Sequence, residues 1–243
     1  MHDTPRAPRR IALVSGEARG DVEASAALLA DFADALLAYE RQSARELGLV
    51  SNPPELRGYV LRPEGEMVAA RDVEGPAEEM PPPVDALVLG FPLDTDSPAP
   101  VRPDRLEPLS EKGLLTPGVL VYAVCTAEAG QAGEVSQRLL PLAQWCESRA
   151  ARWCGALVVE RGSETAGMVG LPRMGLARRN VSEATDRLVA AARAGLTVRQ
   201  AARIFGATRR QAELAERGVI KGRYPLPAAM LAAGYFRSRK RTS

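Results

Sequence analysis

The sequence predicts an α/β protein whose core is a doubly wound, five-stranded parallel sheet with extra helices towards its C-terminal end. Five short apolar runs lie within the first 160 of its 243 residues, and amphipathic segments separate most of them. Strands that alternate with helices in this way build parallel sheets covered by helices. The runs show little alternation of apolar and polar residues, which is typical of strands buried on both faces.

One of these runs, Ala86-Leu-Val-Leu89, predicts the central strand of the sheet, and Gly90 and Pro92 are expected to end it. The loop that follows carries the carboxylates of Asp94 and Asp96. Because ligands of open α/β sheets bind outside the carboxyl ends of the strands, this loop is the first candidate site. The five predicted strands are residues 10–16, 58–61, 86–89, 118–125 and 156–160.

Helical periodicity predicts one long helix over residues 21–48, with Gly48 as its C-terminal stop. The Pro-, Glu- and Gly-rich residues 63–83 are interpreted as a surface loop, and the small residues 126–130 as a loop after the fourth strand. We assign residues 1–195 to the α/β domain and residues 196–243 to a basic helical extension packed on the same domain. The other predicted helices are residues 102–113, 134–149, 181–194, 198–205, 209–218 and 227–237.

Several kinds of catalytic and metal site are not expected from the residue types. The one histidine, His2, lies near the N-terminus, and the three cysteines have no metal-ligand spacing. We therefore predict no metal, no Ser-His-Asp triad and no Cys-His pair, and name no catalytic residue. No apolar run reaches the ~18 residues of a membrane helix, and no secretory signal is apparent. These features predict a cytoplasmic protein with reduced thiols and no membrane partner.

The formal charge of +2 is unevenly distributed along the chain. Residues 196–243 contain 11 Lys and Arg against 2 Asp and Glu, a charge of +9, so the rest of the chain carries −7. Residues 196–212 look like a helix-turn-helix, in which Arg209 and Arg210 begin the recognition helix and Arg199 and Arg203 are available for phosphates. DNA is therefore a second candidate partner. The alternative interpretation is a pair of amphipathic helices that cover the last strand.

Considered together, the runs and loops resemble the flavodoxin-fold family of NADPH-dependent FMN reductases. Ile11-Ala-Leu-Val-Ser-Gly-Glu-Ala-Arg19 resembles the first strand and phosphate loop of that family, and Val84-Asp-Ala-Leu-Val-Leu-Gly-Phe-Pro-Leu93 its third strand and flavin loop. Asp96-Ser-Pro-Ala-Pro100, Tyr122-Ala-Val-Cys-Thr-Ala-Glu-Ala-Gly130, Trp145-Cys-Glu147 and Trp153-Cys-Gly-Ala-Leu157 are similar to stretches of one branch. The resemblance extends from Ile11 to about Lys240, and it rests on the order and spacing of the motifs.

The resemblance implies a flavodoxin-like sheet of strand order 2-1-3-4-5, with FMN bound at its carboxyl edge. It implies that NAD(P)H reduces the flavin, that a small molecule accepts the electrons, and that the protein is a homo-oligomer. The flavin would carry out the hydride chemistry, and the protein would orient it. The implied phosphate-side residues are Ser15, Gly16, Arg19 and Ser25. The implied ring-side residues are Pro92, Leu93, Thr126, Ala127 and Gly130.

Two residues depart from the pattern of that family. Glu17 stands where the family usually has a phosphate-binding serine, and Asp94 stands where many members have an aromatic residue near the ring. A carboxylate repels the phosphate, and the loss of an aromatic surface removes a stacking contact of about 0.5–1.5 kcal/mol. A flavodoxin-like protein that has lost FMN, and one that acts through protein contacts alone, are therefore the remaining interpretations.

Overall fold

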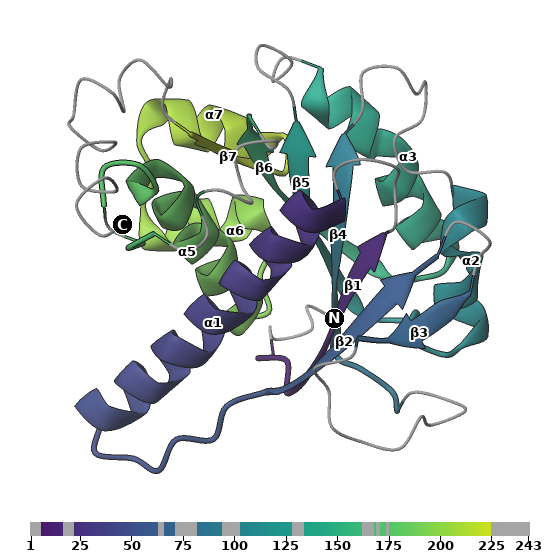
Figure 1. Ribbon diagram of the computed structural model, residues 1–243, viewed down its shortest axis with the longest axis horizontal. Coiled ribbons are helices and arrows are strands. Elements are labelled where there is room, and N and C mark those ends of the chain that lie inside the picture. The colour runs from purple at the N-terminus through teal and green to yellow at the C-terminus, as the bar shows by residue number, and fades with distance from the viewer. Residues whose placement is uncertain are drawn as a thin grey trace, which may run out of the picture.

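The computed structural model describes residues 6–16, 22–62, 66–70, 82–93, 103–127, 134–161, 168, 171–173 and 175–224. Within this part of the chain a seven-stranded sheet lies between two layers of helices (Figure 1). The strands are β1 (Arg10–Gly16), β2 (Glu55–Leu61), β3 (Met67–Ala69), β4 (Ala86–Leu93), β5 (Leu120–Ala127), β6 (Arg152–Glu160) and β7 (Val219–Arg223). The α/β class and the mainly parallel sheet are as the sequence predicts.

The strands follow the order β3-β2-β1-β4-β5-β6-β7 across the sheet. All neighbouring pairs are parallel except β2 and β3. The five expected strands thus lie in the relative order 2-1-3-4-5, which is a flavodoxin-like arrangement. The prediction of five strands in total is wrong, because β3 and β7 extend the sheet at its two edges.

The two additional strands are short and carry weak sequence signals. β3 has three residues and lies within the stretch that was interpreted as a surface loop. β7 has the sequence Val219-Ile-Lys-Gly-Arg223, which combines two apolar residues with two cations and a glycine. It pairs with β6 from Val219 to Arg223, so the segment expected to be a helical extension also contributes a strand.

Two strands also run further than their sequences predict. β4 continues through Gly90 and Pro92 to Leu93, and β5 continues through Thr126 to Ala127. The last β4 residue that pairs with β1 is Gly90, opposite Ser15, so Pro92 pairs only with β5. Such an edge position tolerates a residue that has no N–H to donate. The expectation that Gly90 and Pro92 end the strand is therefore wrong.

The described helices are α1 (Val22–Glu46), α2 (Pro103–Glu111), α3 (Val135–Ser148), α5 (Arg179–Arg193), α6 (Val198–Phe205) and α7 (Arg209–Glu216). Their bounds agree with the predicted helices to within about two residues. Gly48 follows α1 with a φ of 64°, a conformation that favours glycine and ends a helix, as predicted. The predicted helix at 227–237 lies outside the described residues. No helix in the described ranges combines the length and apolarity needed to cross a bilayer.

The sheet separates two apolar cores. Alternate residues of the central strands, such as Val88 and Tyr122, pack with α1 and α5 on one face. Their neighbours, such as Leu89 and Val121, pack with α2 and α3 on the other face. Side chains of a strand point to opposite faces in turn, so both faces must be apolar if both are covered. This packing explains the near-continuous apolar runs, and it confirms the doubly wound arrangement.

Buried charges connect α1 to α5 within the first core. The carboxylate of Asp31 is 5% exposed and pairs with Arg178, whose side chain is 3% exposed. Arg173 also binds Asp31, with 2.6 Å between Nη1 and Oδ1, and it binds Asp186 of α5 through Nη2. Removing a carboxylate from water is costly, so the two guanidinium groups are what make this buried position tolerable.

α1 approaches the sheet closely where it crosses β4. A Cβ atom at Gly90 would lie 2.5 Å from Cδ1 of Leu29 and 3.3 Å from the carbonyl oxygen of Ser25. Leu29 is 4% exposed, so it cannot move aside easily. Only glycine at position 90 therefore allows α1 to pack this close to the strand.

We expect Gly90→Ala to lower the free energy of unfolding by about 1–3 kcal/mol, because the added methyl group overpacks the contact between α1 and β4. Urea denaturation measures this change. Gly16→Ala is the matched control, since its Cβ would lie 3.8 Å from its nearest neighbour, which is an ordinary contact. An equal loss of stability in the two variants would contradict the proposed packing constraint.

Candidate functional site

Three adjacent strands end together at the carboxyl edge of the sheet. Ser15 of β1 lies opposite Gly90 of β4, and Pro92 of β4 lies opposite Thr126 of β5. β2, the next strand in the sequence, lies on one side of β1, and β4 lies on its other side. The order in which the chain adds strands to the sheet therefore reverses between β1 and β4. Open α/β sheets bind their ligands at such a switch point. The predicted site residues in these strands therefore lie along one edge.

The alternation of side chains divides these residues between the two faces of the sheet. Tyr122 and Val124 of β5 belong to the core beneath α1, so Thr126 points to that face as well. By the same alternation Ser15 and Pro92 share the α1 face. Leu93 and Ala127 belong to the core beneath α2 and α3. The structure thus groups Ser15, Pro92 and Thr126, and it separates Leu93 and Ala127 from them.

The predicted phosphate-side residues differ in how they are placed. Ser15 is largely buried, and its hydroxyl lies 3.4 Å from the carbonyl oxygen of Tyr59. Ser25 lies in the first turns of α1 with no exposed surface, next to Gly90. Gly16 is the last residue of β1. Arg19 and Gly130 lie outside the described residues, as do the two departures from the family pattern, Glu17 and Asp94.

Thr126 is the polar side chain at this edge that lacks a partner. Its hydroxyl is buried and makes no hydrogen bond within the described structure, although the residue is only 2% exposed. An unsatisfied buried hydroxyl costs about 1–3 kcal/mol. Groups of this kind are uncommon in folded proteins, and a bound ligand or water is one physical explanation. The hydroxyl therefore suits a ligand with a polar atom at the ends of β4 and β5.

The three cysteines of the chain are poor nucleophiles. Cys125, Cys146 and Cys154 are all buried. Burial raises the pKa of Cys146 to about 12 and that of Cys154 to about 11, and it raises the pKa of Cys125 well above its ordinary value. The thiolate is the reactive form, so these thiols are inert near neutral pH. Among the residues that the structure describes, no three His, Cys, Asp or Glu side chains are grouped to hold a metal ion.

The segment predicted to be a helix-turn-helix forms α6 and α7, joined by residues 206–208. Each helix begins with a capping box, in which Thr197 and Gln200, or Thr208 and Gln211, exchange hydrogen bonds between side chain and backbone. Gly206 follows α6 with a φ of 81°. The two helices pack against each other and against the sheet, so they belong to the main fold (Figure 1).

The arginines of this helix pair differ in their partners. Arg199 and Arg203 both bind Glu216, with 2.7 Å and 2.6 Å between the paired atoms, and are therefore engaged within the fold. Arg209 is 95% exposed and lies 3.3 Å from Glu213 one turn further along α7. Exposed pairs of this kind are weak. Arg210 makes no ion pair in the described part of the chain.

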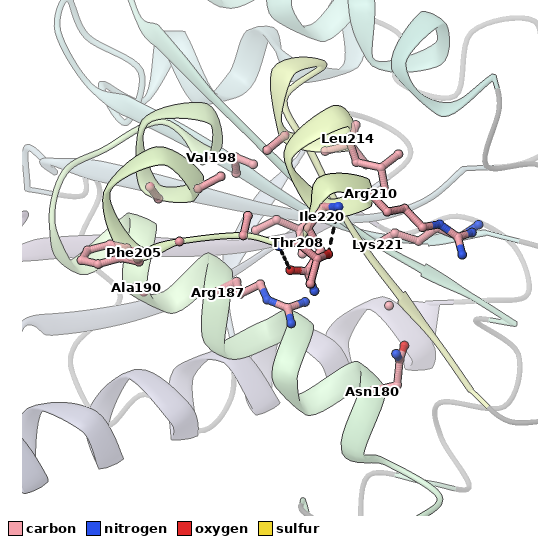
Figure 2. A pocket seen from close by; sticks show the side chains of 18 of the residues that line it. Asn180, Arg187, Ala190, Val198, Phe205, Thr208, Arg210, Leu214, Ile220 and Lys221 are labelled. Atoms are coloured by element: carbon pink, nitrogen blue, oxygen red, sulfur yellow. Dashed lines mark hydrogen bonds between the residues drawn. The ribbon is translucent and has the colours of Figure 1, made fainter.

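A cavity of about 330 Å³ lies between α5, α6, α7 and β7. Figure 2 shows side chains from all four elements around it, including Arg187 of α5 and Arg210 of α7. Sequence reasoning missed this cavity, although it singled out Arg210. The cavity exists only because β7 returns to the sheet beside β6, and the sequence of β7 gave no clear strand signal.

Comparisons with known proteins do not assign a family. No family model matches the chain, and no curated protein matches it. A solved structure described as a flavodoxin of Streptococcus pneumoniae TIGR4 matches with 15% sequence identity and a TM-score of 0.33. The match covers 61% of this chain and 81% of that one. We describe the sheet as flavodoxin-like on its strand order alone, because a likeness this distant carries no functional argument.

We expect Thr126→Val to leave the free energy of unfolding unchanged or to raise it by up to about 1 kcal/mol, because the lost hydroxyl has no partner. The control is Thr185→Val in α5, whose buried hydroxyl donates to the carbonyl oxygen of Val181 at 3.0 Å. That variant should lose about 0.5–1.5 kcal/mol. Urea denaturation compares the two. A loss in Thr126→Val as large as that in the control would show that its hydroxyl is satisfied.

Proposed function

We propose that this protein binds FMN at the carboxyl edge of β1, β4 and β5 and passes electrons from NAD(P)H to a small acceptor. The observation that carries the proposal is the meeting of three parallel strand ends at the switch point of a flavodoxin-like sheet. Such a sheet places FMN at this switch point in flavodoxin itself. The absence of histidine from the described residues fits a reaction in which the cofactor, when bound, supplies the hydride chemistry.

The residues at this edge have the properties that such a cofactor requires. α1 begins at Val22, and the positive dipole at the N-terminal end of a helix favours a phosphate. Ser15 adds a hydroxyl at the end of β1. The unpartnered hydroxyl of Thr126 would bind a polar atom of the ring system. Pro92, on the same face, would present an apolar surface beside it. The homo-oligomer implied by the family resemblance is also part of this proposal.

Visible absorbance tests the proposal directly. We expect protein mixed with excess FMN to remain yellow after desalting, and its thermal midpoint to rise in the presence of the flavin. FMN at about 100 times its dissociation constant would add about 2.7 kcal/mol to the stability of the folded state. We expect Thr126→Val to bind FMN about tenfold more weakly, and Thr185→Val to bind it as the parent does.

Two results would contradict the proposal. The first is a colourless protein whose thermal midpoint does not respond to FMN, which would favour a flavodoxin-like protein that has lost the cofactor. The second is flavin binding that Thr126→Val does not affect, which would retain FMN but place it elsewhere. Oxidation of NADPH by the flavin-loaded protein, followed at 340 nm, then tests the reductase activity separately.

A second candidate function is DNA binding through α6 and α7. The observation that favours it is the geometry of the pair, two helices of eight residues joined by a three-residue turn with a glycine. Arg209 and Arg210 lie at the start of the second helix, where a recognition helix contacts the bases. Arg209 is almost fully exposed, so a phosphate or base edge can reach it.

We expect Arg209→Gln to weaken binding to double-stranded DNA if this second function is correct. Loss of one phosphate contact should reduce the slope of log affinity against log salt concentration by about 1. Fluorescence anisotropy of a labelled duplex, measured at several salt concentrations, gives this slope. The control is Arg179→Gln, an exposed arginine of α5 that lies outside the helix pair and also forms an ion pair with a glutamate one turn along its helix. Equal slopes in both variants would exclude a role for α7.

A further inference from the structure

The cavity between α5, α6, α7 and β7 has apolar walls contributed by all four elements. Ala190 of α5, Val198 of α6, Leu214 of α7 and Ile220 of β7 line it (Figure 2). Its volume of about 330 Å³ falls at the lower end of the range of small-molecule sites, which is roughly 300–1,000 Å³. A cavity with these walls and this size suits a compact organic molecule better than it suits water.

The charged residues of the lining are mainly cationic. Four basic side chains, those of Arg187, Arg210, Lys221 and Arg223, surround the cavity, against the single carboxylate of Glu160. That carboxylate is already engaged, with 2.6 Å to Nζ of Lys221 and 3.6 Å to Nε of Arg223. The positive charge of the lining is therefore not neutralised by the residues that form it.

Arg187 and Arg210 are the cations of this lining that form no ion pair in the described part of the chain. Their neighbours do form ion pairs. Arg179 binds Glu183 on α5, and Arg209 binds Glu213 on α7. Both residues line the cavity, Arg187 from α5 and Arg210 from α7 (Figure 2). A guanidinium group beside an apolar wall is the usual protein partner of a phosphate or carboxylate.

We propose that this cavity binds a small organic anion. Arg187 and Arg210 neutralise its phosphate or carboxylate group, and Val198, Leu214 and Ile220 contact its apolar part. The cavity lies beside β7, and its lining contains no residue of β1, β4 or β5, the strands of the proposed flavin site. The two sites are therefore distinct, and the inference does not rest on the proposed function.

The cavity also differs from the surface that DNA would contact. Arg209, whose side chain is 95% exposed, does not line the cavity, whereas its neighbour Arg210 does. A ligand in the cavity therefore depends on Arg210 and not on Arg209. Because such a ligand touches α5, α7 and β7 at once, its binding holds the helix pair against the edge of the sheet.

Titration with 8-anilinonaphthalene-1-sulfonate, an apolar fluorescent anion, tests the proposal. We expect saturable binding of one dye molecule per chain, weakened at least tenfold by Arg187→Gln and by Arg210→Gln. Arg209→Gln is the matched control, since it removes the same charge one residue away, and it should bind the dye as the parent does. Circular dichroism confirms that each variant is folded, and Arg210 is exposed enough for its variant to fold normally.

Competition then identifies the anionic group. Inorganic pyrophosphate and benzoate are added separately, each against sodium chloride at equal ionic strength. Displacement of the dye by pyrophosphate assigns the site to phosphorylated molecules, and displacement by benzoate assigns it to carboxylates. Three results would overturn the proposal: dye binding that does not saturate, equal weakening by Arg209→Gln and Arg210→Gln, or no displacement by either anion beyond that of sodium chloride.

Discussion

The arrangement of the molecule depends on how closely α1 can approach β4. At Gly90 the side chain of Leu29 and the carbonyl oxygen of Ser25 occupy the space where any other residue would place its Cβ. This contact fixes the first turns of α1 directly over the switch point between β1 and β4. The same constraint therefore sets both the packing of the first core and the position of the helix end that faces the candidate site. A side chain at position 90 would move both.

Ion pairs hold the C-terminal half of the chain in a fixed position relative to α1. Asp31 binds Arg173 and Arg178 near the start of α5, and Glu40 binds Arg193 at its end with 2.7 Å between the paired atoms. Because these contacts lie at opposite ends of α5, they fix both its direction relative to α1 and its distance from α1. Since α5 packs on β7 and against α6, the walls of the basic cavity are also set relative to α1.

The sequence was sufficient to predict the elements that are apolar and long. The central strands and the helices were found because burial on both faces gives a run of apolar residues, and burial on one side gives helical periodicity. β7 was missed because Lys221, Gly222 and Arg223 interrupt its pattern. β4 and β5 were predicted too short because Pro92 and Thr126 were taken for turn residues, although a strand edge accepts both.

The site was predicted less well than the fold for a related reason. Strand alternation alone would have placed Leu93 and Ala127 on the face opposite Pro92 and Thr126. The alternation applies to these residues only because β4 continues to Leu93 and β5 continues to Ala127, which the sequence did not predict. The basic cavity could not be predicted in this way. Its lining comes from residues 160 to 223, and Arg187 and Arg210 approach it only after a strand with no clear signature has joined the sheet.

The position of β7 at the end of the described chain has a consequence for biosynthesis. While the ribosome is still adding residues before Val219, the nascent chain can form β6 but has no strand to cover its outer edge. An uncovered edge strand readily pairs with other chains and leads to aggregation. Glu160 would also lack Lys221 and Arg223 at that stage, and its carboxylate favours water over burial. A charged residue at the end of β6 thus discourages premature pairing until β7 is available.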